Sequence, residues 1–352
     1  MILQGGLSIP VLTALDSQGE LDEGSQVRLL RWVSQEGQGA EILFSGGTTG
    51  EWNRIGARSL RRLNALCAEA LAGQASPVLW AGVTSLKLAE TLANLEAAHR
   101  LHAPAAVLAP LSIEDAPPPV ELFRRHIVPL FERLGAPLPI CLYDNADIAV
   151  PGREAHIRTQ DVKALSQLDF VFGIKVSAPA SVLGNYLKGA RHFKGAHEFG
   201  VYLGNANLSF SIFPHGKGWL SRLARRLSLR GELPLGVVAG PANLFPREWR
   251  RAWRACESGE LDLMRRYEAC FEELGQAWRL GSQSKALACM KLALAEEGIL
   301  ASPAVAPGTA ALTAPEARLW MGRYGKIKGE LAAFSPPGWT SMEEGGNDAT
   351  RF

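Results

Sequence analysis

Short apolar runs alternate with longer amphipathic segments along most of the chain. The short runs consist mainly of apolar residues, many of them β-branched or aromatic, which is typical of buried strands. Eight such runs are present, the seventh and eighth less clearly than the others: residues 7–13, 41–44, 77–83, 105–109, 139–143, 170–177, 192–199 and 235–239. The longer segments have apolar residues at helical spacing: residues 22–35, 57–71, 85–101, 120–134, 160–168 and 180–190.

This alternation predicts a parallel sheet whose strands are joined by helices. Eight units over about 240 residues suit a (β/α)8 TIM barrel. The alternative is a doubly wound open sheet, but no GxGxxG motif follows the first strand, as nucleotide-binding versions of that fold would require.

The chain after the eighth strand is mainly helical, over residues 247–278, 284–297 and 315–333. We therefore expect residues 1–245 to form the barrel and residues 246–334 to form a C-terminal helical extension. Residues 335–352 are polar and rich in glycine and proline, so they are expected to be a mobile tail. Residues 215–230 look like an insertion. Their basic amphipathic pattern favours a solvated helix at a rim or subunit contact over an RNA or membrane surface.

Composition narrows the classes of function. Of the 352 residues, 47% are hydrophobic, so a sizeable core is expected, and the net charge of +2 gives no case for binding nucleic acid or an anionic membrane. Five cysteines without CxxC spacing favour reduced thiols and a cytoplasmic location over a disulfide framework. We expect neither a signal peptide nor a transmembrane segment.

A lysine stands near the end of a predicted strand that is otherwise largely apolar, residues 170–177 (FVFGIKVS). Burying an ammonium group costs several kcal/mol unless the group is paired or neutral, and a neutral amine is a nucleophile. Lys175 is therefore a candidate Schiff-base lysine. The competing interpretation is a lysine at a strand end whose amine reaches solvent.

Other candidates follow neighbouring strands, and the carboxyl ends of barrel strands converge on one face. Tyr143 ends the fifth strand, and Thr48 and Thr49 follow the second. The loop at residues 46–51 (GGTTGE) has glycines that let backbone amides approach an anion, and it suits a carboxylate better than a phosphate because the Walker lysine is absent. A tight structural turn is the alternative. No spacing typical of a metal site or of a serine hydrolase is present.

Together these motifs resemble the dihydrodipicolinate synthase / N-acetylneuraminate lyase family over roughly residues 5–325. The segments that carry the resemblance are 6–22, 47–51 (GTTGE), 142–143 (LY), 173–175 (GIK), 236–243 (GVVAGPAN), 284–286 (SKA) and 297–298 (EG). The resemblance implies a barrel with C-terminal helices, class I aldolase chemistry, a homo-oligomer (dimer or tetramer), and no metal or organic cofactor.

The resemblance also implies a role for each matching residue. Lys175 would form an imine with pyruvate or another 2-keto acid, Tyr143 would move protons, and Thr48 would pass them on. Gly47 and Thr49, with the loop amides, would hold the keto-acid carboxylate. The carbonyl of Val238 would line the opposite wall.

Three departures from the family pattern concern the substrate. Residues 109–113 (APLSI) lack the tyrosine that family members carry there to complete a proton relay from a neighbouring subunit. Arg153 matches the arginine that grips aspartate semialdehyde only if a few residues are inserted, and the segment 215–230 is unusual. Asp144, Asn145 and Asp147 are expected near the pocket mouth, where they could bind substrate hydroxyls.

The sequence therefore predicts a lyase that adds a 2-keto acid to an aldehyde, or cleaves a 4-hydroxy-2-keto acid. Dihydrodipicolinate synthase itself, which joins pyruvate to aspartate semialdehyde, and a sugar-acid dehydratase with the same imine are alternatives. So is a barrel that serves as a sensor or scaffold without catalysis.

Overall fold

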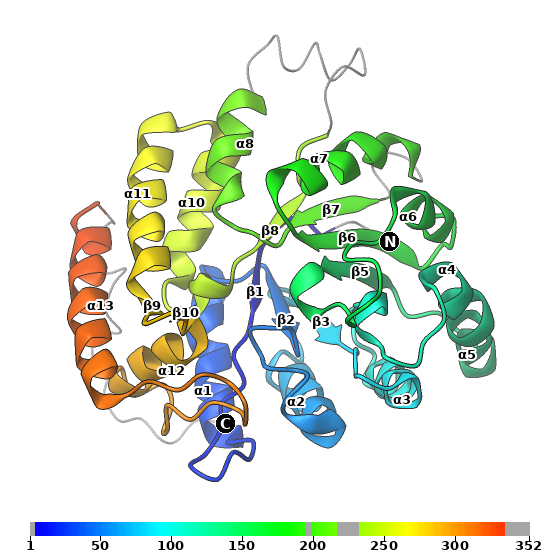
Figure 1. Ribbon diagram of the computed structural model, residues 1–352, viewed down its shortest axis with the longest axis horizontal. Coiled ribbons are helices and arrows are strands. Elements are labelled where there is room, and N and C mark those ends of the chain that lie inside the picture. The colour runs from blue at the N-terminus through cyan, green and yellow to red at the C-terminus, as the bar shows by residue number, and fades with distance from the viewer. Residues whose placement is uncertain (1–3, 194–198, 217–231, 335–352) are drawn as a thin grey trace.

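The backbone closes into a barrel of eight parallel strands (Figure 1). The computed structural model describes residues 4–193, 199–216 and 232–334. The strands are β1 (Gly6–Pro10), β2 (Ile42–Ser45), β3 (Val78–Gly82), β4 (Ala105–Leu108), β5 (Ile140–Asn145), β6 (Val171–Ser177), β7 (Gly200–Leu203) and β8 (Gly236–Val238). They pair in chain order, and β8 pairs back onto β1, where Val237 lies opposite Leu7. This closure confirms the predicted (β/α)8 barrel and rules out the open sheet.

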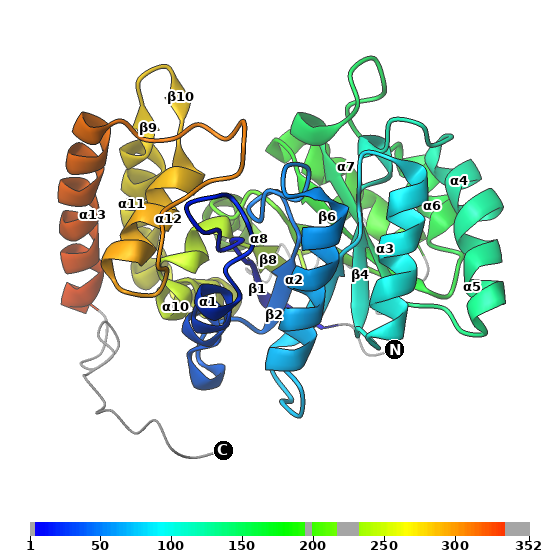
Figure 2. The ribbon, with the colours of Figure 1, turned by 90° about the horizontal axis from the view of Figure 1, so that it is seen from below.

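Helices follow the strands and cover the outside of the barrel (Figures 1 and 2). They are α1 (Glu23–Ser34), α2 (Gly56–Ala70), α3 (Leu88–Arg100), α4 (Pro119–Leu122), α5 (Val128–Leu134), α6 (Thr159–Leu165), α7 (Ala180–Gly189) and α8 (Leu208–Gly216). The first helix begins where its sequence predicts, because the Asp22 side chain accepts a hydrogen bond from the amide of Ser25.

The seventh strand lies at a different place from the one predicted. It was expected at residues 192–199, but His192 belongs to a short 3-10 turn and β7 runs from Gly200 to Leu203. The predicted stretch mixes charged and apolar residues, whereas the side chains of β7 are buried throughout. Residues 194–198 of the predicted stretch lie outside the described residues. The strand in the seventh position of the barrel is β7, which begins one residue beyond the predicted end and has the continuous apolar run that a strand covered on both faces needs.

Large aromatic side chains fill the inside of the barrel. Trp80 of β3 makes edge-to-face contacts with Phe172 of β6 and Tyr202 of β7, at centroid separations of 5.4 and 4.9 Å. Phe44 of β2 and Tyr143 of β5 belong to the same interior cluster. The barrel is therefore a packed core, and functional side chains have room only toward its rim.

The C-terminal helices gather on the opposite side of the molecule from α4 and α5 (Figure 1). They are α10 (Pro246–Ser258), α11 (Leu261–Ala277), α12 (Ala286–Glu296) and α13 (Ala314–Phe334), with a hairpin of β9 (Arg279–Leu280) and β10 (Gln283–Ser284) before α12. The predicted single helix at 247–278 is two helices, because Gly259 takes a left-handed conformation with φ of +81° and ends the first.

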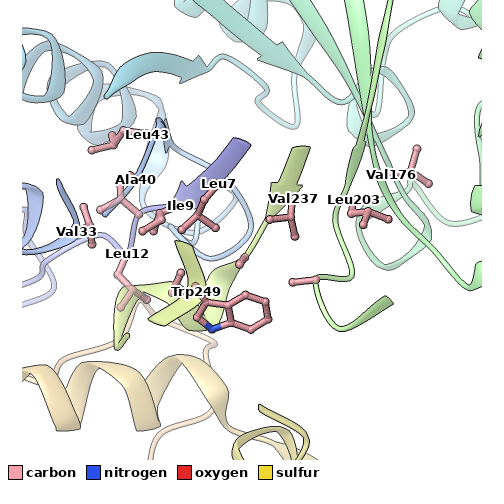
Figure 3. Close-up of a cluster of buried hydrophobic side chains, with 14 of the residues drawn as sticks. Leu7, Ile9, Leu12, Val33, Ala40, Leu43, Val176, Leu203, Val237 and Trp249 are labelled. Carbon is pink, nitrogen blue, oxygen red and sulfur yellow. The ribbon is translucent and has the colours of Figure 1, made fainter. Parts of the chain in front are cut away.

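These helices pack where β8 closes onto β1. Leu7 and Ile9 of β1 and Val237 of β8 lie in a buried cluster with Trp249 of α10 (Figure 3). The Trp249 ring stacks face to face on Phe271 of α11, with centroids 4.0 Å apart and planes 5° apart. The helices that follow the barrel are thus attached to it through a continuous apolar core.

Two expectations concern residues that lie mostly or wholly outside the described ones. The segment 215–230 is described only as far as Gly216, where α8 ends, and the tail at 335–352 is not described at all. Within residues 4–193, 199–216 and 232–334, no helix is long and apolar enough to cross a membrane.

Candidate active site

A bulge in β6 determines which way Lys175 faces. Ile140 and Cys141 of β5 pair with Val171 and Gly173 of β6, so one extra residue is inserted between them. Beyond the bulge, Tyr143 lies opposite Lys175. Bulges re-aim side chains and are frequent beside active sites. Gly173 is required here, because an added Cβ would lie 2.7 Å from the carbonyl oxygen of Gly200 in β7.

The Lys175 amine is buried against aromatic rings. Lys175 is only 5% exposed. Its Nζ lies 3.5 Å from the centroid of the Tyr143 ring and 5.3 Å from the centroid of the Phe44 ring. Contact with the ring faces recovers part of the free energy that an ammonium group loses on leaving water. The amine therefore points into the barrel, and the competing interpretation of a lysine that reaches solvent does not describe it.

The Tyr143 hydroxyl is held by polar groups from two directions. It lies 3.0 Å from Thr48 Oγ1 in the loop after β2, and Asn145 Nδ2 donates to it at 3.0 Å. Burial by itself raises the pKa of Tyr143, but the positive charge of Lys175 and the hydrogen bonds made by the hydroxyl outweigh burial and hold that pKa below its ordinary value. Thr48 and Ser177 contribute to this lowering of the Tyr143 pKa beside Lys175.

The loop after β2 is folded tightly enough to leave two amides available. Within the loop, Gly50 donates to Gly47 and Glu51 donates to Thr48. A Cβ at Gly47 would lie 2.7 Å from the Phe44 ring, so the backbone can follow this path only with glycine there. Among the residues that the structure describes, the amides of Thr48 and Thr49 donate to no protein acceptor. Backbone amides arranged in this way are suited to an anion.

The loop after β2 also meets the end of β8. A Cβ at Gly240 would lie 3.1 Å from Thr49 Oγ1, so the two segments abut at the rim. Val238 precedes Gly240 by two residues and belongs to the interior cluster that includes Phe44 and Tyr143. The predicted residues Lys175, Tyr143, Thr48, Thr49 and Val238 thus lie on the barrel interior or at its rim.

Arg153 occupies a different setting. Its Nη2 donates to the carbonyl oxygens of Glu114 and Ala116, at 2.8 and 2.7 Å. These bonds join the loop after β5 to the loop after β4. The same two loops are joined a second time, where the Val150 amide donates to the carbonyl of Leu111.

The expectation that Asp144 would reach a substrate is wrong. Asp144 alternates with Tyr143 along β5 and is fully buried on the other face. It accepts from the Ile157 amide at 2.9 Å and contacts His156 Nδ1 at 2.9 Å and the Tyr186 hydroxyl at 3.0 Å. Burial raises the pKa of Asp144 despite these hydrogen bonds, and its role is to fix the loop that follows β5.

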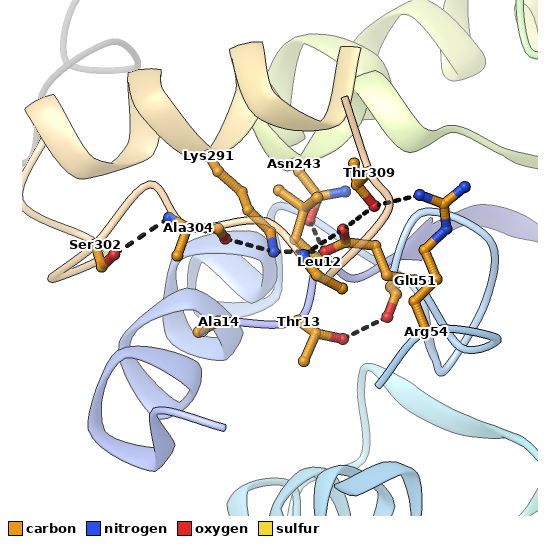
Figure 4. A network of polar contacts seen from close by, with 12 residues as sticks. Leu12, Thr13, Ala14, Glu51, Arg54, Asn243, Lys291, Ser302, Ala304 and Thr309 are labelled. Atoms are coloured by element: carbon orange, nitrogen blue, oxygen red, sulfur yellow. Dashed lines mark hydrogen bonds and ion pairs between the residues drawn. The ribbon is translucent and has the colours of Figure 1, made fainter. Parts of the chain in front are cut away.

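A buried ion pair fixes the far end of the GTTGE segment (Figure 4). Glu51 Oε2 lies 2.5 Å from Lys291 Nζ of α12, and both side chains are fully buried. The other carboxylate oxygen accepts from the Ala306 amide at 2.9 Å and from Thr309 Oγ1 at 2.7 Å. The C-terminal helices and the loop after α12 thus hold the segment that carries Thr48 and Thr49.

Sequence reasoning placed Asn145 near the pocket mouth but missed its hydrogen bond to Tyr143, and it gave Ser177 no role. Asn145 and Ser177 stand two residues beyond Tyr143 and Lys175, so strand alternation puts each on the same face as its neighbour and was the signal for both. The pairing of Glu51 with Lys291 joins positions 240 residues apart, and no local pattern marks it.

Comparison with solved structures places this fold among known ones. Dihydrodipicolinate synthase from Bacteroides thetaiotaomicron superposes with a TM-score of 0.76 at 20% identity, covering 93% of this chain and 99% of that one. The 4-hydroxy-tetrahydrodipicolinate synthase of Methylacidiphilum fumariolicum SolV gives 0.70 at 22%, covering 94% and 97%. YagE from Escherichia coli K12, a prophage protein of the dihydrodipicolinic acid synthase family solved with pyruvate, gives 0.72 at 19%, covering 93% and 99%.

No protein-family model and no curated protein sequence matches the chain. The structural matches nevertheless extend over nearly the whole length of each solved chain, C-terminal helices included. The chain therefore has the fold of dihydrodipicolinate synthase and of the related proteins of that family.

Proposed function

We propose that this chain is a Schiff-base-forming aldolase of the dihydrodipicolinate synthase family, with Lys175 as its nucleophile. The observation that carries the proposal is the buried amine of Lys175, held 3.5 Å from the ring of a tyrosine whose hydroxyl contacts Thr48. Among the residues that the structure describes, Lys175 forms no ion pair that would explain a buried amine on structural grounds. Imine chemistry, in contrast, requires an amine shielded from bulk water beside a proton donor and acceptor.

The first half of the reaction forms the imine. Lys175 first gives a proton to the Tyr143 phenolate. The resulting neutral amine attacks the C2 carbonyl carbon of the keto acid, so that a C–N bond forms, the C=O π bond breaks, and the carbonyl oxygen takes up the proton that the attacking nitrogen loses and becomes a hydroxyl. Tyr143 supplies the proton with which this hydroxyl leaves as water. Thr48 exchanges protons with Tyr143 across their 3.0 Å contact. The amides of Thr48 and Thr49, with the hydroxyl of Thr49 and the close packing at Gly47, hold the carboxylate at C1.

The second half makes or breaks a carbon–carbon bond. The iminium withdraws electrons, so the phenolate of Tyr143 takes a proton from C3, the C–H electron pair becomes the carbon–carbon double bond, and an enamine forms. The enamine carbon adds to the carbonyl carbon of an aldehyde, whose oxygen takes up a proton through Tyr143. Water then adds to the iminium carbon and releases the 4-hydroxy-2-keto acid and the free amine. The reverse sequence is the cleavage reaction, and the carbonyl of Val238 would line the wall opposite the lysine.

The keto acid is proposed to be pyruvate, which is the molecule bound in the YagE structure. The aldehyde is a separate matter. If the aldehyde carries a carboxylate, as aspartate semialdehyde does, Arg153 is the cation proposed to bind that carboxylate. Arg153 would give up one of its two hydrogen bonds to the loop carbonyls and donate to the substrate instead. Dihydrodipicolinate synthase activity itself is the narrower form of this proposal, and loss of activity toward aspartate semialdehyde in Arg153→Ala would support it.

Exchange of the pyruvate methyl protons tests the imine and enamine steps without an aldehyde. In deuterated water, the wild-type protein should replace these protons with deuterium, and Lys175→Met should not. The loss of the methyl signal is measured by proton NMR. If folded wild-type protein exchanges the C3 protons of neither pyruvate nor any of a set of larger 2-keto acids, the proposal is overturned. That result would favour a barrel that binds without catalysis.

A further inference from the structure

The amide of Asn145 can donate to Tyr143 in one orientation only. The Asp147 backbone amide, which is solely a donor, points at Asn145 Oδ1 at 3.1 Å. The oxygen of the side-chain amide must therefore face Asp147, and its nitrogen must face Tyr143. That nitrogen lies 3.0 Å from the Tyr143 oxygen, and because it has no lone pair to offer, the tyrosine oxygen is the acceptor.

We propose that Asn145 is a positioning residue that stabilises the phenolate form of Tyr143 and directs the proton of Tyr143 toward Thr48. This inference rests on the proposed aldolase function, because it assigns a cause to the acid–base behaviour of a residue in that site. It also identifies a partner for Tyr143 within this one chain, where residues 109–113 supply no tyrosine.

The two polar contacts of Tyr143 differ in kind. The Thr48 hydroxyl can donate or accept, so it can follow the proton as Tyr143 gains or loses it. Asn145 can only donate, and its hydrogen bond is stronger when the tyrosine oxygen carries a negative charge. The fixed donor therefore favours the charged form in every step, while the reversible contact provides the path for the proton.

The other groups around Tyr143 act in the same direction. Lys175 and Ser177 of β6 and Thr48 after β2 favour the phenolate, while burial opposes it. Asn145 differs from these groups because its orientation is set by a 3-10 turn, η4 (Ala146–Ile148), that lies outside the barrel. Its contribution can therefore be removed while the lysine and both hydroxyls stay in place.

Two substitutions separate the donor from the turn that it caps. Asn145→Asp keeps an oxygen for the Asp147 amide and replaces the donor to Tyr143 by a negative charge. Asn145→Leu removes both contacts. A matched control is Asn205→Asp, because Asn205 donates instead to the carbonyl of Ala178 after β6.

The test is an NMR titration of protein labelled with carbon-13 at the tyrosine Cζ atoms. The chain has five tyrosines, and the Tyr143 signal is the one that disappears in Tyr143→Phe. The pKa of Tyr143 should rise by about one unit in Asn145→Leu, as expected for the loss of one hydrogen bond to a charged group, and by about two in Asn145→Asp. It should stay unchanged in Asn205→Asp.

A kinetic readout accompanies the titration. The rate of pyruvate proton exchange should depend on pH through the ionisation of Tyr143. That part of the pH profile should move to higher pH by the same amount as the pKa. At pH values below the pKa, each unit of increase in the pKa then makes exchange about tenfold slower. An unchanged Tyr143 pKa in both folded Asn145 variants would overturn the inference. Failure of the proposed function is a separate result, because a wild type that forms no imine with any keto acid still reports the pKa of Tyr143.

Discussion

At the scale of single residues, the proposed chemistry depends on the amine of Lys175 and the phenol of Tyr143, whose ring centroid lies 3.5 Å from the lysine Nζ. Lys175 and Tyr143 are paired across two adjacent strands, so their relative placement is fixed by the backbone. Pre-organised groups of this kind lower the barrier because little rearrangement is needed at the moment of reaction. The polar groups at the rim then tune the phenol while the lysine remains in its aromatic surroundings.

Removal of the Tyr143 hydroxyl should slow proton exchange from pyruvate by about 10²- to 10⁴-fold, the usual contribution of a general acid–base group. Tyr143→Phe keeps the ring against which the lysine packs, so the protein should remain folded. Thr48→Val, which keeps the shape of Thr48, should have a smaller effect of about tenfold. Equal rates for Tyr143→Phe and wild type, measured by proton NMR, would show that another group moves the proton.

At the scale of secondary-structure elements, the site loop depends on a contact with α12. Glu51 and Lys291 are fully buried, and burial lowers the pKa of Lys291 although the Glu51 carboxylate opposes that shift. A pair of this kind contributes little in net terms compared with apolar residues of the same size. Removal of one partner is costly, because the other charge is then buried alone.

Lys291→Met should therefore lower the free energy of unfolding by about 3–5 kcal/mol, measured by denaturant titration. The double variant Glu51→Gln with Lys291→Met should recover part of that loss, because no uncompensated charge remains. Lys326→Met is the matched control: Lys326 pairs with Glu273 on the surface, where both side chains are exposed, so the change should cost less than about 1 kcal/mol. An equal loss of unfolding free energy in Lys291→Met and Lys326→Met would contradict this account of the buried pair of Glu51 and Lys291.

The fold could be predicted where strand and helix periods are clear. Lys175 was recognisable because a charge interrupts an apolar strand, and the barrel followed from the regular alternation of elements. The seventh strand was predicted at residues 192–199, a stretch that mixes charged and apolar residues, whereas β7 is the apolar run at Gly200–Leu203. Asp144 was misjudged because adjacent strand positions face opposite sides. The partner of Glu51 was out of reach, because long-range ion pairs leave no trace in a local pattern.

At the scale of the whole molecule, the cysteines take no part in holding the fold together covalently. No disulfide joins Cys67, Cys141, Cys256, Cys270 or Cys289, and all five side chains are buried. Burial raises the pKa of Cys67 and that of Cys289 to about 12, so their reactive thiolate forms are scarce near neutral pH.

A thiol reagent should consequently label the native protein slowly and all five cysteines once the protein is unfolded. A reductant should leave the free energy of unfolding unchanged. The counts are obtained from the absorbance of the released reagent with and without denaturant. Rapid labelling of the native protein would contradict the burial of these thiols, and fewer than five thiols after unfolding would contradict the absence of disulfides among them.

The most direct test of the central claim is covalent trapping of the imine. The protein is incubated with pyruvate, reduced with borohydride and analysed by intact mass and by peptide mapping. The account predicts one reduced pyruvate adduct per chain, located on Lys175 and absent from Lys175→Met. Absence of an adduct from folded protein with pyruvate and with larger 2-keto acids, or an adduct on another lysine, would contradict it.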